Sequence, residues 1–79
     1  MRLEIITPED ALFKGDVKLV QVPGKKGEFQ ILNLHAPIIS TLDPGKIRVI
    51  LSNGEEKFFP VESGVVECKS NVIQILIEK

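Results

Sequence analysis

The strongest constraint on this chain is the alternation of apolar and polar residues, which has the period of a β-strand. Residues 46–51, for example, place Ile47, Val49 and Leu51 on one face, with Lys46 and Arg48 on the opposite face. Successive side chains of a strand point to opposite faces of a sheet, so this pattern predicts half-buried strands. Strands are predicted in this way at residues 2–6, 17–22, 28–31, 46–51 and 72–78. The apolar faces of residues 46–51 and 72–78 are expected to form the core.

Turn residues separate the predicted strands, and no stretch has the pattern of a ten-residue helix. Asn53-Gly54 predicts a two-residue type I′ hairpin, because both residues tolerate positive φ. Asp43-Pro44-Gly45 fits a type II turn with glycine at the positive-φ position. Residues 23–27 predict a longer turn, and residues 69–71 close a last hairpin. About seven to ten short strands with frequent turns predict an all-β sandwich or barrel.

Length and charge restrict the possible functions. The 79 residues allow one domain, spanning 1–79, with one small core. The net charge of −1 argues against a free-standing nucleic-acid binder, because phosphate neutralisation dominates the affinity of such proteins. The single cysteine excludes an intramolecular disulfide and suits a cytosolic protein. No apolar run approaches the ~20 residues of a membrane-spanning helix, so any membrane association is expected through partners.

Few residues offer chemistry. His35, the only histidine, has no cluster of metal ligands around it in the sequence; it is interpreted as a loop residue that bonds locally or contacts a partner. Cys68 shares a strand face with Val66 and is expected to be a packed thiol. The chain has neither a nucleophile elbow nor a phosphate-binding loop. We therefore expect no catalytic residue, no metal and no cofactor.

Two segments are candidates for partner contact. Gly24-Lys25-Lys26-Gly27 has the G-x-x-G spacing of KH domains, but it lies between strand-like runs instead of helices. It can be a solvated hairpin tip, a contact with an acidic or polar protein, or a contact with nucleic acid. Residues 32–39 are mainly apolar around Pro37. They are either an edge segment that folds over the core or an exposed apolar patch that docks a partner.

Taken together and in order, these pieces resemble the N-terminal domain of the epsilon subunit of F-type ATP synthases. The most distinctive part is His35-Ala36-Pro37-Ile38-Ile39 followed by Pro44-Gly45. The resemblance covers nearly the whole chain, through residues 3–9, 12–17, 20–24, 27–29, 35–39, 44–49, 64–67 and 71–76.

The resemblance implies a flattened, mostly antiparallel sandwich of about ten strands. It implies a non-catalytic subunit of the rotor, on the central stalk, that links the gamma subunit to the membrane c-ring and helps to couple proton flow to ATP synthesis. Such a subunit is peripheral, on the cytoplasmic face of the bacterial inner membrane. By the same resemblance, Glu28 and His35 lie at the end that faces the c-ring. The residues implied in contact with the c-ring or gamma are Gly24, Lys25, Lys26, Gly27, Glu28, His35, Ala36, Pro37 and Ile38.

The sequence departs from the family in two places. Residues 30–34 replace the usual Gly-[Ile/Leu]-x-Pro-Gly segment before His35, which removes three residues with special backbone geometry. Many members also continue into a C-terminal helical hairpin, which has no counterpart here. We therefore expect no ATP site and no block of hydrolysis by that hairpin. The alternative functions are a small β-barrel nucleic-acid-binding module that uses Lys25 and Lys26, and a small enzyme or carrier domain.

Overall fold

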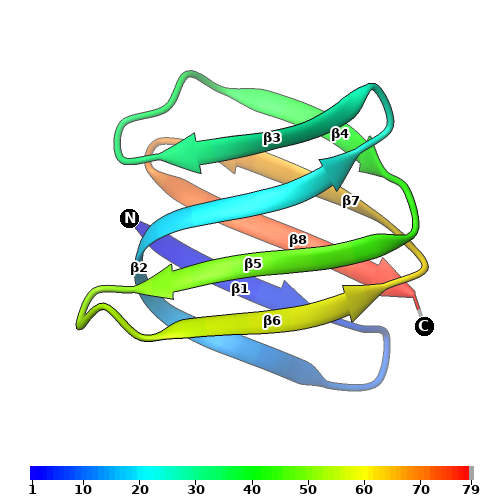
Figure 1. The fold of residues 1–79 in the computed structure, drawn as a ribbon, viewed down its shortest axis with the longest axis horizontal. Helices are drawn as coiled ribbons and strands as arrows, with labels where there is room; N and C mark the ends of the chain where they lie inside the picture. Colours follow the sequence, from blue (N-terminus) through cyan, green and yellow to red (C-terminus); the bar gives the residue numbers. More distant parts are fainter. Residues whose placement is uncertain (79) are drawn as a thin grey trace.

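The computed structural model describes residues 1–78 and contains β-strands without any helix over that range (Figure 1). The all-β prediction is confirmed, with eight strands where about ten were expected. In chain order they are β1 (Arg2–Ile6), β2 (Ala11–Gly24), β3 (Gly27–Leu32), β4 (Ile38–Leu42), β5 (Gly45–Leu51), β6 (Glu56–Val61), β7 (Ser63–Lys69) and β8 (Val72–Glu78).

The strands form one sheet that folds over on itself into two layers (Figure 1). The front layer consists of β3, the second half of β2, β5 and β6. The back layer consists of the first half of β2, then β1, β8, β7 and β4. All neighbouring strands are antiparallel except β1 and β8, which are parallel. The expected flattened, mostly antiparallel sandwich is therefore present.

Strand β2 belongs to both layers because a bulge changes the direction of its side chains. Its pairing with β5 shifts register between Val17 and Leu19. Val17 and Val20 are both buried, although an uninterrupted strand would place residues three apart on opposite faces. A bulge adds one residue and bends the strand, which lets β2 cross from the back layer to the front.

The core between the layers is entirely apolar. Ile73, Ile75 and Ile77 of β8 point into it from the back, and Ile47 and Val49 of β5 point into it from the front. These residues were expected in the core; Leu51, also expected there, is only half-buried at the end of β5. No charged or polar residue among those described is buried, so no side chain of the core requires a hydrogen-bond partner.

The predicted hairpins are present, but two predicted turn types are wrong. Between β5 and β6, only Gly54 has positive φ, and the Gly54 amide donates to the Leu51 carbonyl, so the loop is not type I′. Gly45 does not have the positive φ of a type II turn. The residues after Leu42 instead carry the chain from the back layer to the front. The type I′ geometry occurs between β7 and β8, where Ser70 and Asn71 have φ of 53° and 63°.

Candidate docking surfaces

The predicted contact residues lie along one lateral side of the sandwich, which we call the β3/β4 side and define as residues 24–42. The Gly24–Gly27 turn occupies one corner of this side, and the β3–β4 loop, with His35, occupies the other (Figure 1). Strand β3 separates the two corners by about 17 Å, at roughly 3.3 Å per residue. The turn and Ile38 border a common hollow, whereas His35, Ala36 and Pro37 lie outside it.

Most of the β3/β4 side lacks charge, with Lys25, Lys26 and Glu28 confined to one corner. Residues 29–42 include none of the chain's 21 charged side chains (10 Lys and Arg plus 11 Asp and Glu), although 27% of the chain is charged. Leu34 and Ile39 are 79% and 70% exposed, and Leu32 is 50% exposed. Of the two interpretations of residues 32–39, exposure favours the apolar patch for these three side chains. Ile38 instead packs against the core.

His35 is a partly exposed loop residue that forms a local contact. Its Nδ1 lies 2.7 Å from the carbonyl oxygen of Ala36, and its amide donates to the Leu32 carbonyl. Within residues 1–78, no group of three or more His, Cys, Asp or Glu side chains could hold a metal ion. The local hydrogen bonding agrees with the sequence-based interpretation of this histidine.

A second apolar surface, which sequence analysis missed, lies on the outer face of the back layer. Ile6, Leu76 and Val65 are cross-strand neighbours on β1, β8 and β7. Leu76 is 53% exposed and Val65 is 39% exposed. We call these three residues the outer apolar row. The available signal was that Leu76 is apolar on the face of β8 opposite Ile73, Ile75 and Ile77, where a half-buried strand is usually polar.

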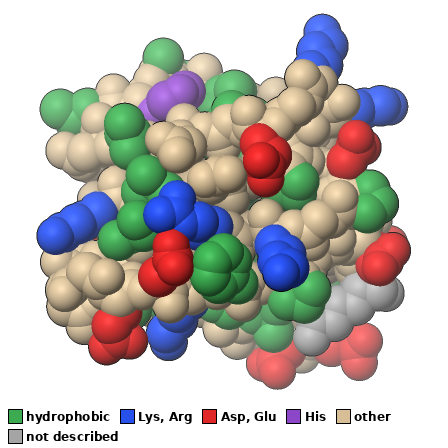
Figure 2. Space-filling model, viewed as in Figure 1, with side chains coloured by type: hydrophobic (Ala, Val, Ile, Leu, Met, Phe, Trp, Pro, Cys, Tyr) green, Lys and Arg blue, Asp and Glu red, His purple; other side chains and the backbone are tan. Residues whose placement is uncertain are grey.

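The outer face of the front layer carries polar groups that pair with one another, as Arg2, Glu4 and Gln74 also do on the outer face of the back layer. Arg48 forms an ion pair with Glu56 and donates to Gln21 Oε1 at 3.3 Å. The ammonium of Lys46 lies 5.9 Å from the ring centroid of Phe58. Figure 2 shows acidic and basic side chains interspersed over this face. Such a surface is typical of one that remains in solvent.

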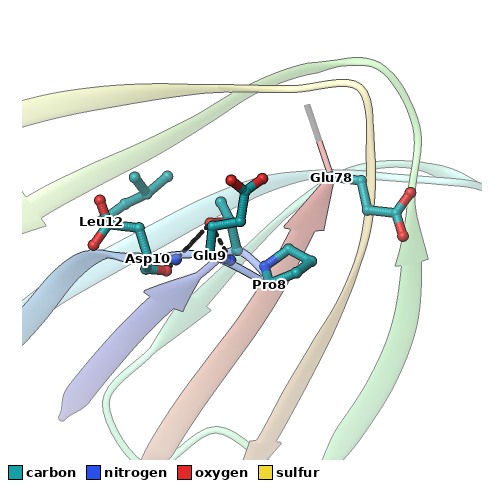
Figure 3. Close-up of a pocket in the computed structure, with 6 residues that line it drawn as sticks. Pro8, Glu9, Asp10, Leu12 and Glu78 are labelled. Carbon is teal, nitrogen blue, oxygen red and sulfur yellow. Dashed lines mark hydrogen bonds between the residues drawn. The ribbon is translucent and has the colours of Figure 1, made fainter.

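The turn between β1 and β2 borders an acidic hollow with Glu78 (Figure 3). Thr7 Oγ1 accepts from the amides of Glu9 and Asp10, at 3.3 and 3.0 Å, which fixes the turn. Figure 3 shows the carboxylates of Glu9, Asp10 and Glu78 pointing in different directions. They do not converge on a point where a cation could bind. The hollow therefore adds no site.

Comparison with known proteins relates this geometry to a family. Residues 1–79 match the profile described as "ATP synthase, Delta/Epsilon chain, beta-sandwich domain". The chain belongs to this family. The match spans the whole chain, and it confirms the resemblance inferred from the sequence.

Curated relatives carry the same family name. The ATP synthase epsilon chain of Nitratiruptor sp. is 41% identical over 99% of this chain, and that of Alkalilimnicola ehrlichii is 33% identical over 99%. The matched region is 60% and 56% of those relatives, so the chain spans little more than half of their length. The epsilon chain of Chlorobium limicola is 40% identical, and the match covers 88% of it.

Solved structures agree on the fold. A chain in the mitochondrial ATP synthase of Euglena gracilis, in an assembly described as OSCP/F1/c-ring, superposes with a TM-score of 0.91 at 19% identity. This match covers 98% of the present chain and 49% of that chain. A chain from the central stalk and c-ring of the Tetrahymena thermophila enzyme has a TM-score of 0.80 at 18% identity. At 18–19% identity, these two matches establish only the sandwich architecture of the chain.

Proposed function

We propose that this chain is a non-catalytic subunit of the ATP synthase rotor that links the gamma subunit to the c-ring and helps to couple proton flow to ATP synthesis. The observation that carries the proposal is the match of all 79 residues to the delta/epsilon family. The described surface supports it, because its conspicuous features are apolar docking surfaces and not a cleft with converging polar groups. The proposed setting is peripheral, on the cytoplasmic face of the bacterial inner membrane.

The gamma subunit is assigned to the outer face of the back layer. There the outer apolar row exposes Leu76 and Val65, and Thr41 of β4 continues the row as the cross-strand neighbour of Val65. Interface cores are depleted in charged residues, which matches this row better than the paired charges of the front layer. In this arrangement the front layer faces solvent.

The c-ring is assigned to the β3/β4 side. Gamma on the back face leaves the lateral sides free, and the β3/β4 side carries the uncharged residues 29–42 between its two corners. Lys25, Lys26 and Glu28 would supply polar contacts at one corner, and His35 to Ile38 would supply contacts at the other. One subunit could thereby bridge two partners with two different surfaces.

A two-stage capture experiment tests this assignment. A c-ring solubilised in detergent and immobilised is expected to retain the chain in the presence of the cognate gamma subunit. Glu28→Ala and His35→Ala are expected to weaken that retention while leaving the affinity for isolated gamma unchanged. Full retention of both variants by the c-ring, combined with loss of gamma binding, would reverse the two assignments.

A further inference from the structure

The β3–β4 loop contains a residue in an unusual backbone conformation. Leu34 has φ of 63°, in the left-handed region that side chains with a Cβ rarely occupy, and its side chain is 79% exposed. A non-glycine residue in this region is strained, and the conformation persists only where the surroundings impose it. Core packing does not impose it here, because the side chain points into solvent.

A local turn, closed by the His35 amide that donates to the Leu32 carbonyl at 3.1 Å, places Leu34 at its positive-φ position, and a second constraint comes from the turn between β7 and β8. The Asn71 side-chain oxygen Oδ1 accepts from the Leu34 amide at 2.8 Å, and its Nδ2 donates to Asn33 Oδ1 at 2.8 Å. The two contacts fix the orientation of the amide group, since a backbone N–H can only meet the oxygen. A side chain 37 residues away thus connects the loop on the β3/β4 side to the back layer.

Asn71 is itself held firmly. It has φ of 63° in the type I′ turn, and its carbonyl accepts from the Arg2 amide at 3.2 Å. Its neighbour Val72 begins β8, which pairs with both β1 and β7. The β3–β4 loop is therefore anchored to a turn that is held by the pairing of β8 with both β1 and β7.

We propose that Asn71 is a positioning residue that pre-organises Leu34 as an apolar anchor for the c-ring; this proposal rests on the function proposed above. A loop already held in its bound conformation loses less conformational freedom when it docks, which strengthens binding without any new contact. Residues 29–42, which surround Leu34, include no Lys, Arg, Asp or Glu, so docking there would not bury an unpaired charge. Leu34 would touch the partner, whereas Asn71 would act through Leu34.

Two substitutions at Asn71 separate its side-chain bonds from its turn conformation. Asn71→Gly keeps the positive φ but removes both bonds, whereas Asn71→Asp keeps an acceptor for the Leu34 amide. Retention of the chain–gamma complex by detergent-solubilised c-ring is expected to fall about tenfold in Asn71→Gly and to be largely kept in Asn71→Asp. Equal retention of Asn71→Gly and the unchanged chain, or equal loss in both variants, would overturn the proposal.

Leu34→Gly distinguishes docking from simple folding. Glycine adopts the left-handed conformation freely, so the melting temperature is expected to stay the same or rise. Retention by the c-ring is nevertheless expected to fall about tenfold, because the anchor is missing. A residue with a merely structural role would lower both quantities together, and that result would count against the anchor.

Amide hydrogen exchange measures the Asn71–Leu34 link without any partner. The Leu34 amide is expected to be protected in the unchanged chain and in Asn71→Asp, and to exchange rapidly in Asn71→Gly. Rapid exchange in the unchanged chain would refute the link while leaving the rotor function intact. A protected amide in a chain that binds neither gamma nor the c-ring would refute the rotor function, and the anchor with it.

Discussion

Ile75 is buried and Glu28 is exposed, so substitutions at these two positions are expected to differ strongly in their effect on stability. Ile75 is fully buried, so Ile75→Ala is expected to lower the free energy of unfolding by about 2–5 kcal/mol. Glu28 is exposed on the hairpin, and Glu28→Ala is expected to change it by less than about 0.5 kcal/mol. Urea denaturation measures both. A loss in Glu28→Ala as large as in Ile75→Ala would show that the hairpin supports the fold instead of a partner.

Cys68 links stability to alkaline pH. Burial raises the pKa of its thiol above the ordinary value of 9.0, so the folded chain binds this proton more tightly than the unfolded chain. The sign follows from linkage: this stabilising contribution is complete below about pH 9 and is lost as pH rises toward the folded-state pKa. The stability advantage over Cys68→Ala should therefore shrink above pH 9. Parallel pH–stability curves for the two proteins would contradict it.

At the residue scale, alternation was enough to predict part of the core, including Ile47, Ile73 and Cys68, because strand period determines which residues share a face. It could not predict the backbone of Leu34. That conformation belongs to the turn between Leu32 and His35, and it is also held by Asn71, which the fold places beside the loop through the β7–β8 turn. Local sequence does not contain such a contact.

At the scale of elements, hairpin positions were predictable and turn geometry was not. Asn53-Gly54 has the strongest local preference for type I′, yet the four residues between β5 and β6 adopt another loop, in which the Leu51 amide donates to the Glu55 carbonyl. Ser70-Asn71 adopts type I′ because the register of β7 and β8 pairs Lys69 directly with Val72. Register between the strands thus overrides the local preference of the turn residues.

Gly64 of β7 gives a prediction at this scale. A Cβ at this position would collide with the backbone carbonyl oxygen of Leu76 and lie 3.2 Å from Ile77 Cγ2, so alanine would force β7 and β8 apart. Gly64→Ala is expected to cost about 1–3 kcal/mol. Gly15→Ala is the control, because the nearest atoms there belong to the side chain of Phe13. Equal melting temperatures for the two variants would contradict a backbone constraint at Gly64.

At the scale of the whole molecule, the sequence and its family resemblance predicted a sandwich. They did not predict which outer surface of the sandwich carries an apolar row. That property emerges only when β1, β8 and β7 align Ile6, Leu76 and Val65 in one row. The contact residues on the β3/β4 side could be proposed from family resemblance. Their separation into two corners required the path of β3.

The outer apolar row predicts a difference between the two faces of the sandwich. Leu76 on the back layer and Phe58 on the front layer are both 53% exposed, so a charge at either should leave folding nearly unchanged. Leu76→Asp is expected to weaken gamma binding at least about tenfold, because it places a charge in the core of the interface. Phe58→Asp should bind as the unchanged chain does. Calorimetric titration of both variants checks this; equal loss in both would deny that the back face is the docking face.

The most direct test of the rotor assignment is a calorimetric titration of the unchanged chain into the purified cognate gamma subunit. The account predicts saturable binding with one chain per gamma. No binding at concentrations of tens of micromolar, with the chain folded, would contradict it.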